Sequence, residues 1–341
     1  MPTIYFSGRK LPDQLRQQLG QLGHHIIGPF EQGLAVGLAT ASENVESIEY
    51  IITVGTAPPS EVSPTVLKRL PNLKLVACLG SGYECLVPAI DFFRNSGIYA
   101  THSTDANSSC VADQCLALVL ACTRRILQGD MFVRAHLWDN PTKAFVAPTL
   151  QIPRGLGELK IGILGLGTIG LKVAKRAAAF EMQVGYCNRR KRVDVNPEYE
   201  FFDSPLALAE WCDVFAVCLR ADSSTFHIVD RAVLEAIGAA GFLVNISRGV
   251  AVDERALVQL LKERKLAGCG LDVFENEPVV DEELLGLGLE TTGDLGPSVI
   301  LAPHRGGWTS IARRNMCQAV VDNVQSVFLG QGPVSPIPEL R

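Results

Sequence analysis

Two side chains that can take part in carbonyl chemistry follow directly on short apolar runs. Arg248 comes after the run 242–246, and His304 comes after the run 299–302. A guanidinium can hold a carboxylate or a carbonyl oxygen by two parallel hydrogen bonds. An imidazole can donate a proton to a carbonyl oxygen while hydride reaches the carbon. A surface arginine and a structural histidine are the alternatives, and these two residues alone leave them open.

Three carboxylates stand close together around the end of a third apolar run. They are Asp272, Glu275 and Glu277. A carboxylate beside an imidazole would fix the tautomer of the ring. Acidic loops are common, however, and the residue types do not show which of the three carboxylates has this task.

A glycine motif predicts a second kind of site. The apolar run Lys160–Leu164 leads into Gly-x-Gly-x-x-Gly, which includes Gly165, Gly167, Thr168, Ile169 and Gly170. The first glycine permits a tight turn, the second lets the backbone approach a pyrophosphate, and the third lets the next helix pack close to the strand. The start of that helix offers free N–H groups to phosphate. The motif therefore predicts dinucleotide binding, with a tight turn that binds nothing as the alternative.

The end of the following strand bears on the choice of dinucleotide. This run, Gln183–Cys187, is followed by Asn188, where an NAD site usually has an acidic residue for the ribose hydroxyl. Arg189 and Arg190 come next, and two more cations follow. A carboxylate would repel a 2′-phosphate, whereas amide and guanidinium groups can bind one. We therefore expect NADP(H) in preference to NAD(H), with a solvated basic turn as the alternative.

Alternating strands and helices must position these residues. In the second half of the chain we expect strands over Lys160–Leu164, Gln183–Cys187, Val214–Cys218, Phe242–Ile246, Gly268–Val273 and Val299–Ala302. Helical segments lie between most of them, so the pattern predicts a doubly wound parallel sheet with its ligands at the carboxyl ends of the strands. Residues 139–158 are expected to form a loop.

The first hundred residues predict further parallel β packing. The expected elements are strands over Thr3–Phe6, Tyr50–Val54 and Leu73–Cys78 and a helix over Leu11–Leu22. A helix that begins near Asn107 is apolar throughout Cys115–Cys122, and we expect it to be buried on all sides. The last helix is expected over about Ser310–Leu329.

Composition excludes several classes of protein. The chain has 341 residues, of which 47% are apolar and 20% charged, which suits about two globular domains and excludes disorder. Its 31 basic and 36 acidic residues give a net charge of −5, so no nucleic-acid partner is expected. We find no membrane span and no secretory signal. Its ten cysteines contain no Cys-x-x-Cys pair, so we expect reduced core thiols, no metal site and a cytoplasmic protein.

Taken together, the motifs resemble those of the D-isomer-specific 2-hydroxyacid dehydrogenases, close to the glyoxylate/hydroxypyruvate reductase and hydroxyphenylpyruvate reductase branches. The resemblance covers nearly the whole chain and rests on Gly80–Glu84, Val111–Asp113, Gly165–Gly170, Val244–Gly249, Gly270–Pro278 and Ala302–His304. It implies an α/β fold with two Rossmann-like domains. A cofactor domain of residues 107–302 would be inserted into a substrate domain of residues 1–106 and 303–341. Helices starting near Asn107 and Trp308 would cross the hinge.

The resemblance also implies roles for particular residues. Arg248 and His304 would be catalytic, and Glu277, directly before a proline, would pair with the histidine. Further cofactor contacts would come from Cys218, Leu219, Arg220 and Asp272, with Arg220 standing where a proline is usual. The substrate would contact Arg248, His304, Trp138 and the backbone of Leu79, Gly80, Ser81 and Gly82, whose N–H groups would take its carboxylate. Trp308 departs from the family pattern and could narrow the pocket or stack on an aromatic substrate.

These observations predict an NADPH-dependent reductase that converts 2-oxo acids to D-2-hydroxy acids. By resemblance we expect a homodimer, with Trp138 able to reach the partner's active site. The alternative is a dinucleotide-sensing interaction protein related to the carboxyl-terminal-binding corepressors, which share the fold and the Arg/Glu/His set. We expect the enzyme, because only a short segment follows the last expected helix.

Overall fold

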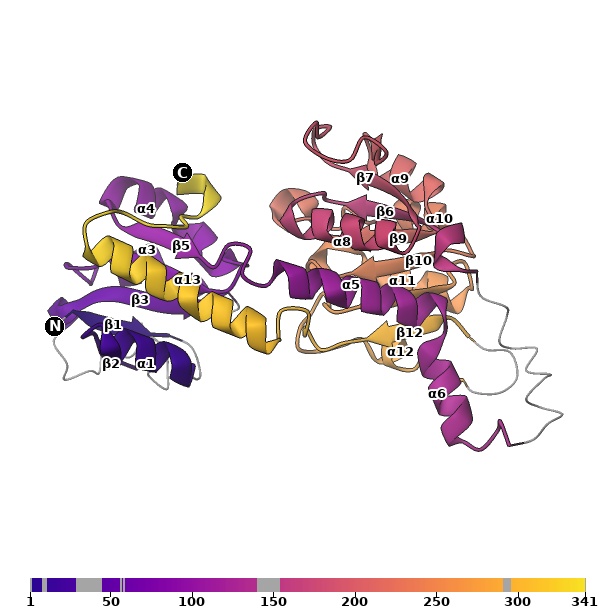
Figure 1. The fold of residues 1–341 in the computed structure, drawn as a ribbon, viewed down its shortest axis with the longest axis horizontal. Helices are drawn as coiled ribbons and strands as arrows, with labels where there is room; N and C mark the ends of the chain where they lie inside the picture. Colours follow the sequence, from indigo (N-terminus) through magenta and orange to yellow (C-terminus); the bar gives the residue numbers. More distant parts are fainter. Residues whose placement is uncertain are drawn as a thin grey trace. The chain divides into compact units, whose positions relative to one another are not determined.

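The computed structural model describes residues 2–7, 11–28, 45–55, 57, 59–139, 154–290 and 296–340. The chain divides into two compact units, one formed by Met1–Asn107 and Trp308–Arg341 and the other by Ser108–Gly307 (Figure 1). The boundaries of the units lie close to the starts of the two long helices, Ser108–Thr123 in the larger unit and Ser310–Phe328 in the smaller one. Most of the expected loop 139–158 lies outside the described residues.

Seven parallel strands form the sheet of the larger unit, in the order β12-β11-β10-β9-β6-β7-β8. They are β6 (Lys160–Leu164), β7 (Gln183–Cys187), β8 (Glu200–Phe202), β9 (Val214–Val217), β10 (Phe242–Asn245), β11 (Gly268–Leu271) and β12 (Ser298–Leu301). The six predicted strands are confirmed. The sequence prediction missed β8, because this short edge strand carries no long apolar run. The strand order reverses between β6 and β9, which is where a doubly wound sheet binds its ligand.

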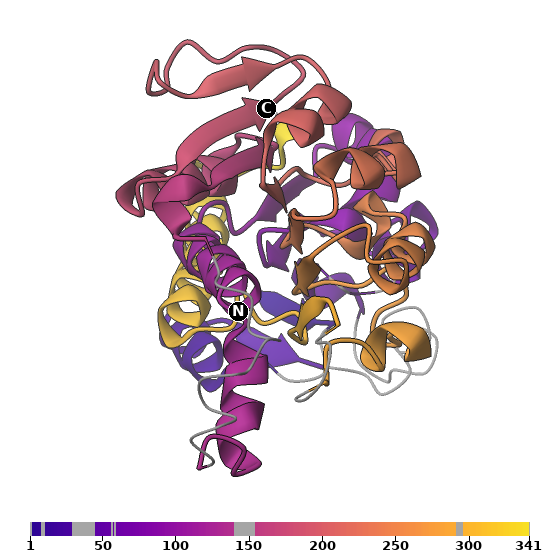
Figure 2. The same cartoon turned by 90° about the vertical axis from the view of Figure 1, so that its right-hand side faces the viewer.

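Helices cover both faces of this sheet (Figure 2). The helices are α5 (Ser108–Thr123), α6 (Ile126–Arg134), α8 (Thr168–Ala179), α9 (Pro205–Trp211), α10 (Arg231–Ile237), α11 (Glu254–Lys262) and α12 (Glu282–Leu285), with short 3₁₀ turns η4 (Leu156–Glu158), η5 (Ser223–Thr225) and η6 (Gly249–Ala251). Side chains alternate along β9: Val214 and Ala216 pack with α5 and α8, whereas Phe215 and Val217 pack with α9, α10 and α11. Apolar packing on both faces of the sheet therefore holds the carboxyl ends of the strands in fixed register.

Helix α5 corrects one expectation. It is not buried on all sides, because Ala117 is exposed and Leu120 is only half-buried. Its buried side, which includes Cys115 and Val119, lies in the core formed with α8 and the sheet. The sheet buries only the side of the helix that faces it, and the opposite side of α5 stays accessible.

Five parallel strands form the sheet of the smaller unit, in the order β2-β1-β3-β4-β5. Its elements are β1 (Thr3–Phe6), α1 (Asp13–Gln21), β2 (His25–Ile27), η1 (Val45–Ser47), β3 (Ile48–Val54), η2 (Pro59–Val62), α3 (Pro64–Leu67), β4 (Leu75–Leu79), η3 (Glu84–Ala89), α4 (Ile90–Ser96), β5 (Tyr99–His102), α13 (Ser310–Phe328) and η7 (Pro338–Leu340). The predicted strands and both predicted helices are confirmed. The sequence prediction missed β2 and β5, which are short edge strands with polar residues.

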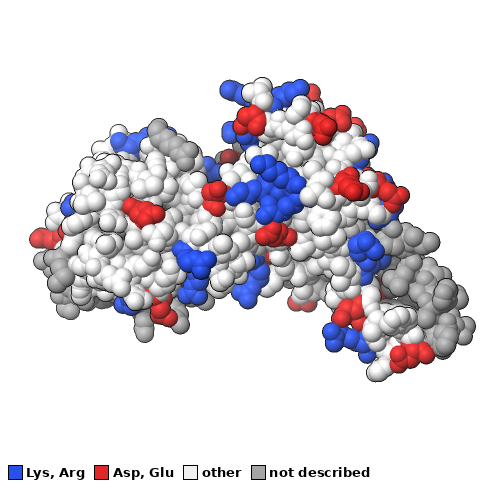
Figure 3. Space-filling view, in the orientation of Figure 1, with Lys and Arg blue, Asp and Glu red and all other residues white. Residues whose placement is uncertain are grey.

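Charge is distributed without a dominant sign on the face shown in Figure 3, where basic and acidic patches are interspersed. No helix of the described part of the chain is long and apolar enough to span a membrane. All ten cysteines are free thiols, of which Cys110 is half-buried and the rest are buried.

Candidate active site

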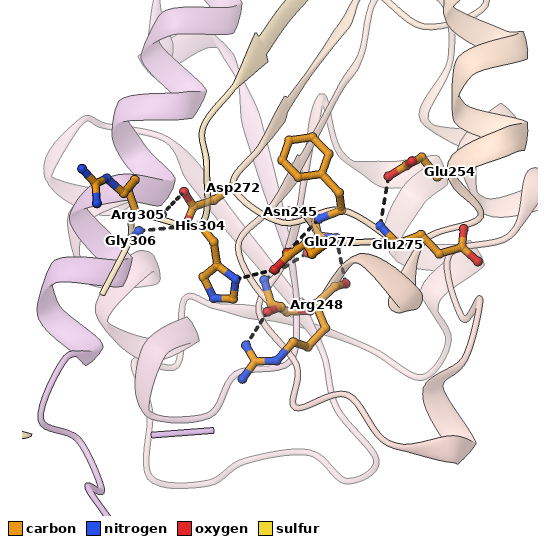
Figure 4. Close-up of polar contacts among 11 residues, drawn as sticks. Asn245, Arg248, Glu254, Asp272, Glu275, Glu277, His304, Arg305 and Gly306 are labelled. Atoms are coloured by element: carbon orange, nitrogen blue, oxygen red, sulfur yellow. Dashed lines mark hydrogen bonds and ion pairs between the residues drawn. The ribbon is translucent and has the colours of Figure 1, made fainter. Parts of the chain in front are cut away.

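Three adjacent strands of the larger sheet deliver the predicted catalytic residues to one edge. Arg248 follows β10, Glu277 follows β11, and His304 follows β12. The strands are parallel and in register, with Asn245 opposite Leu271 and Leu271 opposite Leu301. Their carboxyl ends therefore meet, and the three side chains lie close together (Figure 4).

His304 and Glu277 form a hydrogen-bonded pair. Nδ1 of the imidazole lies 2.8 Å from Oε2 of the carboxylate. The other oxygen, Oε1, accepts the backbone N–H of Phe274 at 3.0 Å. Because a carboxylate only accepts, the proton of the neutral ring is held on Nδ1 and Nε2 is left to exchange a proton with a ligand. This is the arrangement that a histidine acid or base requires.

The charge of Glu277 is maintained despite partial burial. Burial alone would raise the pKa of this carboxyl. Hydrogen bonds from His304 and Phe274 and the positive charge of Arg248 outweigh burial, so the pKa lies below its ordinary value. Glu277 therefore remains an anion at neutral pH.

Hydrogen bonds to its carbonyl and N–H groups fix the backbone of Arg248. The side-chain amide of Asn245 donates to the carbonyl of Arg248 at 3.0 Å, and the N–H of Arg248 donates to Oγ of Ser247 at 2.5 Å. The next residue, Gly249, lies against the chain near Glu277: a Cβ there would stand 1.9 Å from the carbonyl carbon of Phe274. The guanidinium of this half-buried residue is held by its own hydrogen bond, from Nη1 to the carbonyl of Ser247 at 2.7 Å, and its charge acts on Glu277.

Asp272 holds the turn that carries His304. Its buried carboxylate accepts the N–H of Arg305 at 2.8 Å and the N–H of Gly306 at 2.8 Å. His304 has a φ of 53°, a left-handed conformation that a histidine adopts only when its surroundings impose it. These two hydrogen bonds supply that constraint. The contact of Asp272 with a cofactor that the resemblance implies stays a prediction.

Glu275 serves another histidine. Its Oε1 lies 2.9 Å from Nε2 of His227, and its backbone N–H donates to Glu254 at 3.1 Å. Burial raises the pKa of Glu254. The sequence prediction did not identify His227 or Glu254, because neither stands at a strand end or in a recognisable spacing. The three clustered carboxylates thus have three separate partners, and only Glu277 pairs with His304.

The glycine loop fits the pyrophosphate of a dinucleotide. Gly165 has a φ of 98°, and a Cβ on it would stand 2.5 Å from the backbone of Leu219; a Cβ on Gly170 would stand 2.1 Å from the carbonyl of Gly165. A Cβ on Gly167, in contrast, would meet no atom of the described residues within 4 Å, its chain neighbours aside. Gly167 caps α8, so this open space faces the unpaired N–H groups of the helix, which include those of Thr168 and Ile169.

Asn188 and Arg192 support this loop from the end of β7. Oδ1 of Asn188 accepts the N–H of Leu166 at 2.7 Å, and Nη1 of Arg192 donates to the carbonyl of Leu166 at 2.8 Å. Arg192 is also ion-paired with Asp194. Of the four cations after β7, Arg192 is therefore committed to the loop, whereas Arg189 and Arg190 extend into solvent.

The predicted residues after β9 lie next to the same loop. A Cβ on Gly165 of this loop would stand 2.5 Å from the backbone of Leu219. The pKa of Asp222 is lowered, chiefly by hydrogen bonds from Ser224 and also by the charges of Arg220 and Arg189. A hydrogen bond with Cys115 and burial raise the pKa of the Cys218 thiol well above its ordinary value. Cys218 is 8% exposed, and its N–H donates to the carbonyl of Leu164 at 2.9 Å.

The predicted carboxylate-binding segment Leu79–Gly82 lies in the smaller unit, at the end of β4. Its residues are half-buried. The N–H of Gly80 donates to the carbonyl of Cys78 at 3.1 Å. Within the described part of the chain, the N–H groups of Ser81 and Gly82 donate to no protein acceptor. They are the two amides of this segment that a bound anion could use.

The two predicted tryptophans are largely in solvent. Trp138 follows α6 and is 62% exposed, and Trp308 precedes α13 and is 73% exposed. Neither is labelled among the residues around Arg248, Glu277 and His304 in Figure 4. Their assignment to substrate binding remains a prediction.

Comparison with known proteins identifies the family. Residues 116–306 match the model of the D-isomer-specific 2-hydroxyacid dehydrogenase NAD-binding domain. The chain is 36% identical over 299 residues to a 2-ketogluconate reductase of Gluconobacter oxydans, covering 87% of this chain and 90% of the relative. It is 35% identical over 274 residues to a hydroxyphenylpyruvate reductase of Plectranthus scutellarioides, covering 80% of each.

A solved structure extends the likeness to the whole fold. An NADPH-dependent glyoxylate/hydroxypyruvate reductase of Sinorhizobium meliloti, in complex with NADP and malonate, superimposes with a TM-score of 0.82 at 29% identity, covering 99% of this chain and 97% of the other. The chain therefore belongs to the D-isomer-specific 2-hydroxyacid dehydrogenases and is an NAD(P)-dependent oxidoreductase.

Proposed function

We propose that the protein reduces small 2-oxo acids to D-2-hydroxy acids with NADPH. The observation that carries the proposal is the His304–Glu277 pair at 2.8 Å, beside Arg248 and at the same sheet edge as the glycine loop. The names of the relatives given above refer to 2-ketogluconate, hydroxyphenylpyruvate, glyoxylate and hydroxypyruvate. All four compounds are 2-oxo acids. The corepressor-like alternative is not favoured, since these relatives are reductases.

Each residue of the site has a chemical task in this reaction. The reduced nicotinamide, when bound, supplies a hydride to carbon 2 of the acid. Arg248 polarises the carbonyl with its guanidinium. His304 donates the proton from Nε2 to the carbonyl oxygen, and Glu277 stabilises the charge that the ring carries before the transfer. In the smaller unit, the amides of Ser81 and Gly82 would bind a carboxylate group.

The preference for NADPH is supported by the orientation of Asn188. Its oxygen is occupied by the N–H of Leu166, so the remaining polar group of the side chain is the NH₂, a donor. A donor suits phosphate oxygens as well as a hydroxyl, whereas an aspartate would repel the phosphate. Arg189 and Arg190 follow directly and are exposed. Together these groups favour a 2′-phosphate.

We also propose a cytoplasmic homodimer. Free buried thiols are typical of a reducing compartment. Helix α6 exposes Ile126 at 55% and Val133 at 50%, and Trp138 follows at 62%. Exposed apolar side chains of this size on one short segment are typical of a subunit interface. Light scattering coupled to gel filtration would test the assembly, and a monomer at micromolar concentration would contradict it.

The experiment for the activity is absorbance at 340 nm with purified protein, NADPH or NADH, and a panel of acids. The panel contains glyoxylate, hydroxypyruvate, phenylpyruvate, 4-hydroxyphenylpyruvate and 2-ketogluconate. We expect turnover with at least one acid and a clear preference for NADPH. Tight dinucleotide binding without turnover of any acid would contradict the proposal and return attention to a sensing function.

A further inference from the structure

The carbonyl groups of Gly80 and Ser81 accept hydrogen bonds from the last residue of β5 and from the residue after it. The backbone N–H of Ser103 donates to the carbonyl of Gly80 at 2.9 Å. Nδ1 of His102 lies 3.0 Å from the carbonyl oxygen of Ser81. Because a carbonyl only accepts, this ring nitrogen must carry a proton for the bond to form. Two consecutive peptide groups are thus fixed by donors behind them.

These peptide groups are the ones that present the two available amides. The carbonyl of Gly80 and the N–H of Ser81 belong to one peptide unit, and the carbonyl of Ser81 and the N–H of Gly82 belong to the next. In a trans peptide the C=O and the N–H point in opposite directions. A donor bound to the carbonyl therefore leaves the N–H directed to the other side.

Hydrogen bonding at the carbonyl also affects the strength of the amide as a donor. Withdrawal of electron density at the oxygen polarises the peptide, so its N–H binds an acceptor more strongly, an effect that is larger away from bulk water. His102 is 8% exposed. The histidine is thus placed to strengthen the Gly82 amide as well as to orient it.

The ring of His102 is held in this position on its other sides. The hydroxyl of Thr104 lies 2.7 Å from Nε2, and it can donate to that nitrogen when the ring is neutral with its proton on Nδ1. Tyr83 packs against the ring, with centroids 4.7 Å apart, and its own hydroxyl donates to Glu339 at 3.1 Å. One neutral tautomer, with its proton on Nδ1, therefore satisfies both of these hydrogen bonds of the ring.

We propose that His102 is a positioning residue for substrate carboxylate, acting through the peptide between Ser81 and Gly82. It does not touch the substrate; it holds and polarises the amide that does. The inference rests on the proposed function in one respect, namely that the anion bound by Ser81 and Gly82 is the carboxylate of a 2-oxo acid.

Two variants separate the donor from the ring. His102→Phe keeps an aromatic ring against Tyr83 but removes the donor to Ser81. His102→Asn removes the ring but retains an N–H donor of similar reach. Melting temperatures and the Kd for NADPH serve as checks that both variants are folded and that the larger unit is unaffected.

The measurement is titration with oxamate, a carboxylate probe that is not reduced, followed through the backbone amide resonances of the protein with NADPH bound. In the wild type we expect the Ser81 and Gly82 resonances to shift. We expect the Kd for oxamate to rise about tenfold in His102→Phe, equivalent to about 1.4 kcal/mol, and to stay within about threefold of the wild type in His102→Asn. The KM for a reducible acid should follow the same order, with little change in kcat.

Several outcomes would overturn the inference. Wild-type affinity in a folded His102→Phe would show that the donor is not used. Equal weakening in both variants would show that the ring matters only for packing. An absence of oxamate-induced shifts at Ser81 and Gly82 would remove the anion site, even if the enzyme reduced 2-oxo acids. Conversely, donor-dependent oxamate binding without turnover of any acid would contradict the proposed function and leave the inference standing.

Discussion

Nδ1 of His304 lies 2.8 Å from Oε2 of Glu277, although the two residues follow different strands. The pair forms because β11 and β12 are parallel neighbours in register. The left-handed backbone of His304 then directs the ring back toward the carboxylate, and Asp272 holds the turn through two amides. The buried Asp272 thus positions His304, and the partly exposed Glu277 sets the tautomer of its ring.

The acid pair predicts unequal effects of substitution on activity. His304→Ala should lower kcat by a factor of about 100 or more, because the proton donor is lost. Glu277→Gln should lower kcat less, by about tenfold, since an amide oxygen can still accept from Nδ1 but carries no charge. Glu275→Gln is the matched control, because Glu275 contacts His227 and not His304. Steady-state kinetics with a saturating 2-oxo acid would measure all three, and a larger loss in Glu275→Gln would reverse our assignment.

The basic segment after β7 predicts a cofactor-specific effect. Arg189→Ala combined with Arg190→Ala should raise the KM for NADPH by at least about tenfold, with little change for NADH, because only NADPH carries the 2′-phosphate. Arg192→Ala should raise the KM for both cofactors, since Arg192 holds the carbonyl of Leu166 in the glycine loop. Equal effects of the double variant on both cofactors would contradict the role of these arginines.

Gly167 predicts a loss of binding without a loss of stability. A methyl group on Gly167 meets no atom within 4 Å among the residues that the structure describes, its chain neighbours aside, so Gly167→Ala should leave the melting temperature of the apoprotein nearly unchanged. The same methyl group would occupy the space that a pyrophosphate needs, so the Kd for NADPH should rise at least about tenfold. The control for NADPH affinity is Gly20→Ala in α1, because a methyl group there also meets none of the described residues within 4 Å. Unchanged NADPH affinity would show that the pyrophosphate does not approach there.

His24 predicts a pH-dependent change in stability. Its ring is 7% exposed, and it packs edge-on against Tyr50 and Phe328. Burial lowers the pKa of His24 below its ordinary value of 6.5, so the unfolded chain binds a proton at a pH where the folded protein does not. The free energy of unfolding should therefore fall as the pH drops below about 6.5.

His24→Phe keeps an aromatic ring and removes the titration. We expect its free energy of unfolding, measured in urea between pH 7.5 and 5.5, to fall less than that of the wild type. Parallel pH dependence of the two proteins would exclude His24 as a source of the effect.

The local sequence determined the strands, the glycine loop and the positions of Arg248 and His304. Apolar runs that end in glycine or in a charged residue are contiguous signals, and a parallel sheet places their ends together. The missed strands β2, β5 and β8 are short and at sheet edges, where little apolar surface is needed. The apolar run Cys115–Cys122 predicts burial of α5 on all sides, but the structure leaves Ala117 on its outer side exposed.

Only the tertiary structure decided how the polar groups are paired. Asp272, Glu275 and Glu277 are equivalent in the sequence by charge, but their partners come from segments far apart in the chain: Arg305 and Gly306, His227, and His304. His102 is likewise placed behind Ser81 by the pairing of β5 with β4. A hydrogen bond forms only when the donor and acceptor are at the right distance, within a few tenths of an ångström, and in the right direction. Such geometry is set by strand register and core packing, which residue types and spacing along the chain do not specify.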